Sequence, residues 1–211
     1  MTKSKILGVG AEAIVILNSD FSVSKFRPAK GYRISVIDDK IRKFRTRAEG
    51  RLMLKASKIV NTPIVSEVDE KSHKIIMSFV KGVKLSDFLS SSSLIDSESV
   101  CFVLGGEVSK LHDSNIIHGD LTSSNIIVND DKLDKNVKKV FFIDFGLSFH
   151  SDKFEDKAVD VHLFKEALEA KHYDRFSSLY KSFLKGYSSS KNYNKVLDQL
   201  KKVEARGRYR H

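Results

Sequence analysis

The chain has 211 residues but only one cysteine, Cys101, and two prolines, Pro28 and Pro63. With one cysteine it can form neither an intramolecular disulfide nor a cysteine-based zinc site, which is typical of a reducing compartment such as the cytosol. The N-terminal apolar stretch is interrupted by Gly8 and Gly10, so it is too short for a signal peptide. No later apolar run approaches the length that spans a membrane. The sequence therefore predicts a cytoplasmic protein that does not associate with membranes.

Acidic residues are in the minority, because 27 of them stand against 37 lysines and arginines, a formal net charge of +10. Two segments, 40–58 and 191–211, carry much of the excess. A basic surface suggests a polyanionic partner such as RNA, or an acidic protein face. Solvated helix faces explain the first segment equally well. The hydrophobic share of 41% with 14 phenylalanines is sufficient for a packed core, in one domain or in two small lobes.

The most informative stretch has the pattern His-x-Asp-x-x-x-x-Asn at residues 118–125, followed by Asp-Phe-Gly at 144–146. Phosphoryl transfer from ATP requires a carboxylate beside the acceptor hydroxyl and oxygen ligands for the Mg²⁺ that accompanies the phosphates. We therefore interpret Asp120 as the catalytic base, and Asn125 and Asp144 as the metal ligands. The two motifs, in this order and at strand ends, form the catalytic-loop and metal-loop signature of the protein-kinase superfamily. Two unrelated turns are the alternative interpretation.

Near the N-terminus, residues 8–15 match the glycine-rich pattern G-x-G-x-x-G-x-V, with alanine in place of the third glycine. Glycines let a backbone approach phosphate groups and donate N–H groups to them. Glu12 departs from this picture, because a carboxylate at the loop tip should repel phosphate. We expect the loop to cover the nucleotide differently from that of an ordinary kinase. The nucleotide-binding residues predicted in this loop are Gly8, Gly10, Ala11, Glu12 and Ala13.

A strand at 21–27 places Lys25 where a kinase needs a catalytic cation for the α- and β-phosphates of ATP. A helix is expected to begin at Asp38 or Asp39, as the N-cap, and to end near residue 60. We predict that Glu49 of this helix forms an ion pair with Lys25; the alternative is a pair with a lysine or arginine of its own helix. The apolar stripe of the helix recurs at three- and four-residue steps: Ile41, Phe44, Ala48 and Leu52.

Two more strands are expected at 64–68 and 74–79, followed by the connection 77–82 between two lobes. In kinases the backbone of this connection binds adenine, and we assign that role to the Ser78 carbonyl and the Val80 amide. Since main-chain groups would make these contacts, the side chains at both positions can vary. The serine run that follows is read as a flexible connector.

The second half of the chain is mostly helical, and Asp160 is expected to brace the catalytic loop; a plain helix-face carboxylate is nearly as consistent with the pattern. The sequence predicts an α+β, two-lobed, minimal protein-kinase-like fold, with an antiparallel sheet and one helix in the N-lobe and a reduced helical C-lobe. Helices are expected at 85–89, from Asp96 or Ser97 to 112, and at about 155–168, 173–185 and 193–205. A single kinase domain, 1–211, is expected to comprise an N-lobe (1–79), a hinge (80–82), a C-lobe (83–205) and a basic tail (206–211).

Over nearly its whole length the chain resembles one branch of that superfamily, the small kinases of the KEOPS complex, which are relatives of the RIO kinases. The resemblance implies a serine/threonine kinase and ATPase that uses ATP with Mg²⁺ and works beside the enzyme that installs threonylcarbamoyladenosine in tRNA. It implies that the C-lobe binds this transferase subunit and the N-lobe a small accessory subunit. The basic helix and tail are candidate contacts for tRNA, and the sequence leaves open whether the tail touches it. The segments that carry the resemblance are 10–13, Lys25, 28–33, 45–49, 118–125, 143–147, 155–160 and 206–210.

Several departures from ordinary kinases are evident. Thr122 stands where those enzymes have a lysine, so one cation that stabilises the transition state is absent, and we hypothesise that Arg208 or Arg210 replaces it. Gly119 takes the place of the arginine that binds an activation-loop phosphate, and no Ala-Pro-Glu follows the Asp-Phe-Gly. The usual peptide-binding platform is therefore largely missing, which favours regulation by a partner and ATP hydrolysis as the relevant turnover.

Three other functions remain open. A RIO kinase of ribosome maturation should carry a winged-helix domain before its glycine loop, which here begins at Gly8. A small-molecule phosphotransferase normally has a larger C-lobe with substrate-binding helices. A non-catalytic scaffold would tolerate the loss of catalytic groups, whereas all of those predicted above are present.

Overall fold

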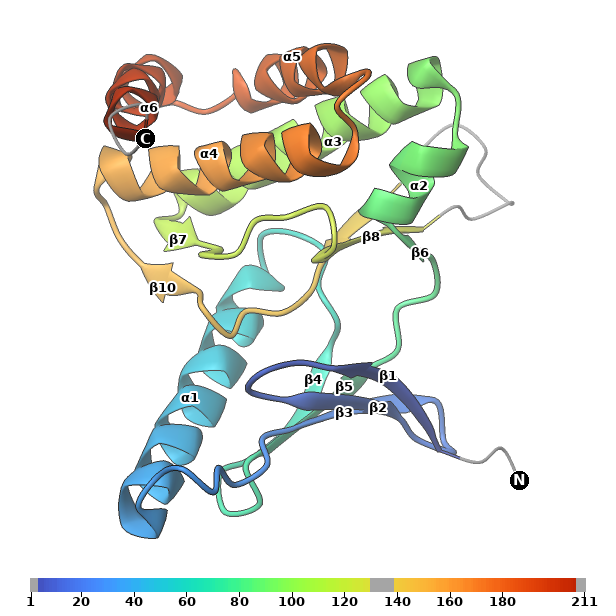
Figure 1. The fold of residues 1–211 in the computed structure, drawn as a ribbon, viewed down its shortest axis with the longest axis vertical. Coiled ribbons are helices and arrows are strands. Elements are labelled where there is room, and N and C mark those ends of the chain that lie inside the picture. Colours follow the sequence, from blue (N-terminus) through green and yellow to red (C-terminus); the bar gives the residue numbers. More distant parts are fainter. Residues whose placement is uncertain (1–3, 130–138, 208–211) are drawn as a thin grey trace. The chain divides into compact units, whose positions relative to one another are not determined.

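The computed structural model describes residues 4–129 and 139–207 (Figure 1). The described chain forms two compact units, one of residues up to Lys58 with 62–80, and one of residues 59–61 with 81 onwards. No helix within the two described ranges is long and apolar enough to cross a membrane.

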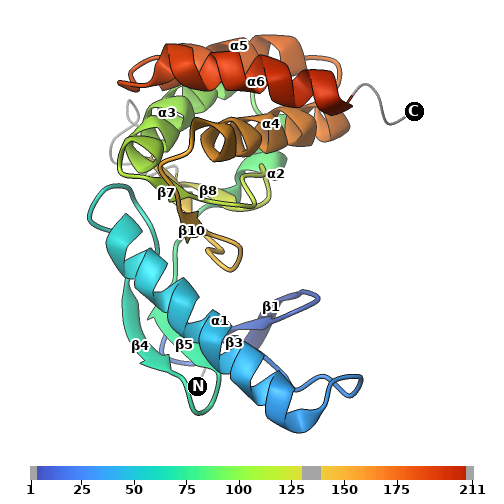
Figure 2. The same ribbon diagram turned by 90° about the vertical axis from the view of Figure 1, so that its left-hand side faces the viewer.

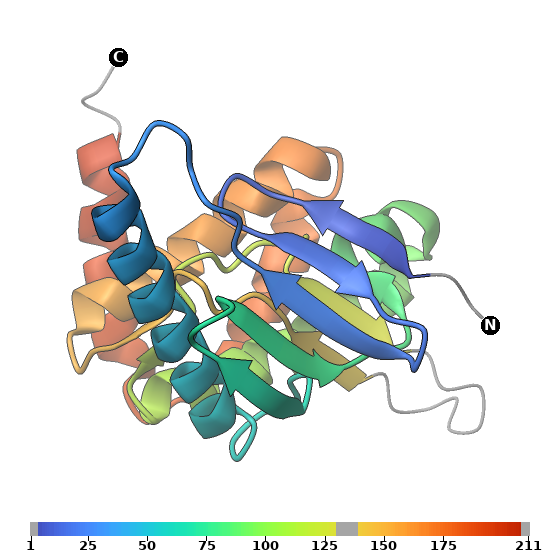
Figure 3. The same ribbon diagram turned by 90° about the horizontal axis from the view of Figure 1, so that it is seen from below.

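The N-terminal unit is an antiparallel five-stranded sheet with one long helix beside it (Figure 3). The helix α1 (Ser35–Ala56) packs against the last two strands of the sheet order. The middle strand, β3, pairs on both sides, so that Lys25 lies opposite Val15 on one neighbour and Ile75 on the other. This double pairing fixes the backbone of Lys25. The strands follow the order β1 (Lys5–Val9), β2 (Ile14–Leu17), β3 (Ser22–Phe26), β5 (Lys74–Ser78) and β4 (Val65–Asp69).

The start of α1 was predicted wrongly. The helix begins at Ser35, and the residue before it, Ile34, has an extended backbone. Asp38, one of the two expected N-caps, lies inside the first turn, where it is 2% exposed. Its carboxylate accepts hydrogen bonds from Arg42 at 2.6 Å and Arg33 at 3.4 Å. A capping residue and a helical residue that binds arginines look the same in a sequence, because both roles favour aspartate.

The face that α1 buries also differs from the predicted apolar stripe. Phe44 of that stripe is 70% exposed. The buried face instead combines polar and small residues: Asp38, Thr46, Glu49, Gly50, Met53 and Ala56. Periodicity counts apolar residues only, so it did not identify the buried polar residues Asp38 and Thr46.

The C-terminal unit is a helical assembly with two small sheets. Figure 2 shows α5 and α6 as an outer layer over α3 and α4, and the contacts agree, since α5 packs on α3 and α6 on α4. Where α3 and α5 cross, no side chain fits at Gly105, because a Cβ there would lie 2.0 Å from the carbonyl oxygen of Phe183. The helices are α2 (Leu85–Ser91), α3 (Leu94–Asp113), α4 (Phe154–Lys171), α5 (Phe176–Tyr187) and α6 (Tyr193–Gly207).

The short strands of this unit carry the predicted motifs. A three-stranded sheet has the order β6 (Val83–Lys84), β8 (Ile126–Asn129) and β9 (Lys139–Phe142). A two-stranded sheet pairs β7 (Ile116–Ile117) with β10 (Phe149–His150). The segment with the first motif runs from β7 to β8, and Asp-Phe-Gly follows β9. The sheet with one helix and the helix-rich second unit confirm the predicted α+β, kinase-like class.

One helix start in this unit was also predicted wrongly. α3 begins at Leu94, and Ser93 is its N-cap, with Oγ accepting from the amide of Asp96 at 3.1 Å. The expected caps, Asp96 and Ser97, lie inside the first turn. The serine run is therefore not a plain connector, because it ends α2 and then caps α3.

Candidate functional site

The structure brings Asp120 and Asn125 into direct contact. Asn125 Nδ2 donates to Asp120 Oδ2 at 2.7 Å and to the Asp120 carbonyl oxygen at 3.0 Å. The loop between them is also closed by backbone bonds, from Thr122 N to the Asp120 carbonyl at 2.9 Å and from Asn125 N to the Thr122 carbonyl at 3.1 Å. An amide that donates through its nitrogen presents its oxygen as an acceptor, so this geometry leaves Asn125 Oδ1 suited to a metal ion.

Asp160 braces this loop from α4, as predicted. Its carboxylate accepts from the amides of His118 at 2.7 Å and Gly119 at 2.9 Å. His112 Nε2 lies 3.2 Å from the same carboxylate, which is 1% exposed. A buried carboxylate that receives several hydrogen bonds is held rigidly. The backbone directly before Asp120 is therefore fixed by one side chain.

His118 connects the loop to the strand that precedes Asp-Phe-Gly. Its Nε2 lies 3.2 Å from the Ile143 carbonyl oxygen, and since a carbonyl only accepts, the proton is on Nε2. The ring is buried 5.1 Å from that of Phe145. Burial lowers the pKa of His118, and the opposing charge of Asp160 does not reverse the shift. His118 is thus a neutral structural link.

Gly119 stands where ordinary kinases have arginine, and the backbone explains why. Its φ is 77°, a left-handed conformation that side chains disfavour. A Cβ at this position would lie 2.2 Å from the carbonyl oxygen of Leu147. The segment after Asp-Phe-Gly therefore closes over the loop at a point where no side chain fits.

Asp144 lies just after β9, and Asn125 lies directly before the neighbouring strand, β8. β8 and β9 pair with Ile126 opposite Phe142, and the amide of Ile143 donates to the Asn125 carbonyl at 3.0 Å. Asp144 has a φ of 64°, an uncommon conformation for a residue with a side chain. Its Oδ1 accepts from the amide of Gly146 at 3.1 Å. The two predicted metal ligands thus stand at neighbouring strand ends.

The donor set fits Mg²⁺. Asn125 and Asp144 offer amide and carboxylate oxygens, the ligands that this hard cation prefers. No group of three or more His, Cys, Asp or Glu side chains within residues 4–129 and 139–207 could hold a metal ion by itself. Mg²⁺ in nucleotide sites commonly has only one or two protein ligands and takes the remainder from phosphate and water. The site therefore suits a metal that arrives with a polyphosphate.

In the N-terminal unit the predicted ion pair is present, and it has a third member. Lys25 Nζ lies 2.7 Å from Glu49 Oε1, and Arg27 lies 2.5 Å from Glu49 Oε2. All three side chains are buried. Sequence reasoning missed Arg27, although residues two apart on a strand point to the same face, and that signal could have found it.

The glycine-rich loop is held by side chains rather than by glycine geometry. A Cβ at Gly8 would meet nothing within 4 Å, and at Gly10 only the Ala13 carbonyl oxygen at 3.5 Å. Gly10 N donates to that same carbonyl at 2.9 Å, which closes the turn. Lys30 Nζ donates to the Ala11 carbonyl.

Glu12, expected to repel phosphate, is neutralised inside its own unit. Arg33 lies 3.0 Å from Oε1 and Arg45 lies 2.6 Å from Oε2. Desolvation alone would raise the pKa of Glu12, but hydrogen bonds and charges from the two arginines outweigh it and lower the pKa. The carboxylate therefore links the loop to Arg33, which precedes α1, and to Arg45, which lies within that helix.

The residues predicted to bind adenine, Ser78 and Val80, lie at the end of the N-terminal unit. Ser78 ends β5, and its amide donates to the Ile64 carbonyl at 2.8 Å, while its Oγ accepts from the Ile64 amide at 2.9 Å. Val80 follows as the last residue of the N-terminal unit. The tail cations Arg208 and Arg210 lie outside the described residues. A cation that the sequence did not suggest, Lys171 of α4, donates to Ser124 Oγ at 3.2 Å.

Solved structures with the same fold include a Rio2 kinase from Chaetomium thermophilum in an ADP/Mg²⁺-phosphoaspartate complex, with a TM-score of 0.63 and 18% identity over 96% of this chain and 70% of that one. The aminoglycoside phosphotransferase APH(2'')-Ib, bound to ADP, has a TM-score of 0.64 and 14% identity over 95% and 81% of the two chains. At such identities the likeness shows the fold alone.

Sequence relatives are more specific. The family described as "Protein tyrosine and serine/threonine kinase" matches residues 30–179. The KEOPS complex subunit Bud32 of Pyrococcus abyssi is 38% identical over 98% of this chain and 96% of its own length. A probable bifunctional tRNA threonylcarbamoyladenosine biosynthesis protein of Methanobrevibacter smithii is 37% identical over 98% of this chain, which spans 37% of that longer protein. The chain therefore belongs to the protein tyrosine and serine/threonine kinase family and, within it, to the family of the KEOPS complex subunit Bud32.

Proposed function

We propose that this protein is the ATP-dependent kinase and ATPase subunit of a KEOPS complex, and that it supports the threonylcarbamoyl modification of adenosine in tRNA. Two relatives support this role, one named as a KEOPS subunit and one as a bifunctional protein of threonylcarbamoyladenosine biosynthesis. The observation that carries the catalytic part is the 2.7 Å contact of Asn125 with Asp120, in a loop whose backbone Asp160 holds.

Each predicted residue has a defined task in this proposal. Asp120 orients the attacking hydroxyl and takes its proton, and the hydrogen bond from Asn125 fixes the carboxylate for that purpose. Asn125 and Asp144 hold Mg²⁺, which offsets the negative charge of the phosphates when it is bound. Lys25 contacts phosphate oxygens, and Glu49 keeps its ammonium in place. Backbone groups of Ser78 and Val80 bind the adenine.

The acceptor is a serine or threonine hydroxyl, or water. With Thr122 in place of the usual lysine and Gly119 packed under Leu147, the loop lacks two cations that ordinary protein kinases use. Fewer substrate-binding groups favour simple hydrolysis of ATP. In the proposed assembly the C-terminal unit binds the transferase subunit and the N-terminal unit a small accessory subunit, in the cytoplasm.

Phosphate release from ATP tests this function. The wild-type protein is measured with Mg²⁺, alone and with tRNA and a candidate transferase subunit. Asp120→Ala is expected to reduce turnover roughly a hundredfold or more, the usual contribution of a general base. Asp198→Ala, a change at an exposed carboxylate of α6 that is 69% accessible, is the matched control and should leave turnover unchanged. Equal activity in the wild type and Asp120→Ala would instead favour a non-catalytic scaffold.

A further inference from the structure

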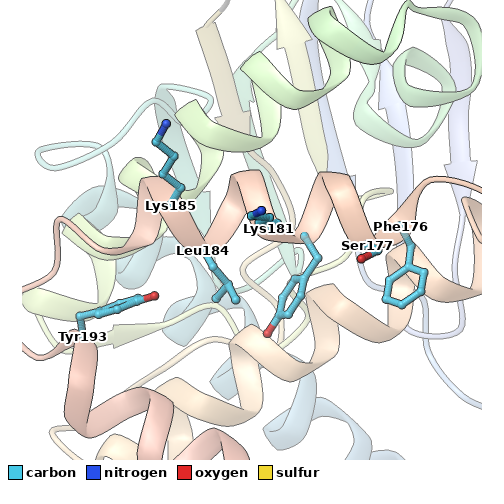
Figure 4. Close-up of a pocket in the computed structure, with 7 residues that line it drawn as sticks. Phe176, Ser177, Lys181, Leu184, Lys185 and Tyr193 are labelled. Atoms are coloured by element: carbon cyan, nitrogen blue, oxygen red, sulfur yellow. The ribbon is translucent and has the colours of Figure 1, made fainter.

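A pocket of about 500 Å³ lies along α5 and the start of α6 and contains none of the residues assigned above (Figure 4). Its apolar lining is mostly aromatic: Phe176, Tyr180 and Tyr193, with Leu184. Figure 4 shows Leu184 and Tyr193 pointing into the same space between the two helices. Aromatic walls of this kind can accept a flat, unsaturated ring by stacking.

The rim of the pocket is basic. Lys181 and Lys185 line it from α5, one helical turn apart, and both are exposed. In Figure 4 the Lys185 ammonium extends away from Leu184, so it lies outside the apolar space. Across residues 176–202 there are six lysines, all exposed, and one acidic residue, Asp198. The pocket thus lies in a segment with a clear excess of exposed positive charge.

The walls of the pocket are supported from behind. The ring of Tyr180 stacks on that of Phe183 at 6.2 Å, and the rings of Tyr187 and Tyr193 lie 6.2 Å apart. Phe183 and Tyr187 are fully buried where α5 crosses α3. A pocket whose walls rest on a packed core is available without ordering a loop, which lowers the conformational entropy lost on binding.

We propose that this pocket binds an unpaired nucleotide of an RNA strand, with the base stacked on the aromatic wall and the neighbouring phosphates held by Lys181 and Lys185. Stacking on aromatic side chains beside a basic track is how proteins bind single-stranded nucleic acid. An acidic protein segment would also be attracted by the lysines, but it would not make use of the ring surfaces. The choice of RNA over other polyanions rests on the proposed function, whereas the pocket does not depend on ATP chemistry.

The first test is fluorescence anisotropy with a labelled single-stranded RNA of mixed sequence and with the same strand annealed to its complement. The wild type should prefer the single strand, because paired bases cannot stack in a pocket. Lys181→Gln/Lys185→Gln should weaken binding roughly tenfold and lower the slope of log affinity against log salt by about 1.4, as expected for two lost phosphate contacts.

The matched control is Lys201→Gln/Lys202→Gln, which removes the same charge from exposed positions of α6 outside the pocket. If both double variants lose affinity equally, the surface binds RNA by diffuse charge and the proposal is wrong. If the pocket variant keeps its RNA affinity but no longer binds a candidate transferase subunit, the pocket is a protein-docking site and the proposal is equally wrong.

A second pair of variants tests the stacking. Tyr193→Leu keeps an apolar side chain and should weaken single-strand binding between roughly fivefold and a hundredfold, as expected for one stacked base. Tyr180→Phe keeps the ring and should bind RNA as the wild type does. Thermal unfolding shows whether each variant is folded, and ATP turnover should be unchanged in all of them. If the wild type itself did not hydrolyse ATP, the proposed function would be contradicted, but the RNA-binding measurement would still test the pocket.

Discussion

The guanidinium of Arg45, in α1, lies 2.6 Å from the carboxylate of Glu12 at the tip of the glycine-rich loop. Arg33 holds the other carboxylate oxygen of Glu12 at 3.0 Å. In this protein the loop is thus tied to the helix region by a charge cluster within one unit. Both Glu12 and Arg45 are more than one-third exposed, so solvent screens the pair and its effect should be on loop position rather than on stability.

Arg45→Met should raise the KM for ATP roughly two- to fivefold with little change in kcat. This size is expected because an exposed ion pair contributes at most about 1 kcal/mol of free energy. The variant loosens the loop and removes one of the two cations that compensate the charge of Glu12, and both changes weaken phosphate binding. Initial-rate kinetics of ATP hydrolysis give the two constants separately. Arg47→Met, a change in the same helix that breaks the ion pair of Arg47 with Glu70 beyond β4, is the control. Equal KM values in the two variants would contradict this role of the loop contact.

Because Glu49 is paired with both Lys25 and Arg27, we expect substitutions of the two cations to have similar effects on stability but different effects on activity. Lys25→Met leaves Glu49 paired with Arg27, and Arg27→Met leaves it paired with Lys25, so both variants should fold with similar free energies of unfolding. Only Lys25→Met should abolish ATP turnover, since Lys25 is the proposed phosphate contact. Glu49→Gln removes the carboxylate between two buried cations and should cost about 3 kcal/mol.

Urea unfolding and phosphate release measured on the same preparations check these expectations. A Lys25→Met variant that turns over ATP like the wild type would remove Lys25 from the proposed site. A Glu49→Gln variant as stable as Lys25→Met would show that the carboxylate does not hold both cations.

The brace from Asp160 predicts a large effect of a single-atom change. Asp160→Asn keeps the size of the side chain but offers one acceptor oxygen and one donor group to the two amides of His118 and Gly119. One buried amide is then left without an acceptor, which should destabilise the protein by about 2 kcal/mol. Because the loop before Asp120 shifts, kcat should fall more than KM changes.

The control for this brace is Asp156→Asn, on the same helix, where the carboxylate accepts from Ser151 Oγ at 2.6 Å. This variant should retain wild-type kcat. If Asp160→Asn lowers stability but leaves kcat unchanged, Asp160 supports the fold without positioning the catalytic loop.

What the sequence could predict depended on separation along the chain and on residue type. Asp120 and Asn125 are five residues apart in one tight loop, so their spacing alone implies contact, and Asp160 was recognisable as a carboxylate on the next helix. The partner of Glu12 was not predictable, because Arg33 and Arg45 are two among many cations and only the tertiary fold selects them. The inward face of α1 was missed for a related reason. The ion pair with Lys25 placed Glu49 on the inward side, but a rule that counts apolar residues does not find Asp38 and Thr46, which are buried on the same helix.

The buried, neutral His118 predicts that stability falls on acidification. Burial lowers the pKa of His118 in the folded protein, and likewise that of His172, so the unfolded chain binds protons on these residues at a higher pH than the folded chain does. Stability should be unaffected well above pH 6.5, the ordinary value for histidine, and should fall as the pH drops below it, by at most about 1.4 kcal/mol per pH unit for each group. The loss ends once the pH passes below the folded-state pKa.

His118→Gln should reduce the difference between the free energies of urea unfolding at pH 7.5 and pH 5.5. The control is Ser148→Ala, which removes the 2.6 Å hydrogen bond to the His118 carbonyl and should lower stability equally at both pH values. An undiminished pH dependence in His118→Gln would show that this histidine is not what makes the fold sensitive to acid.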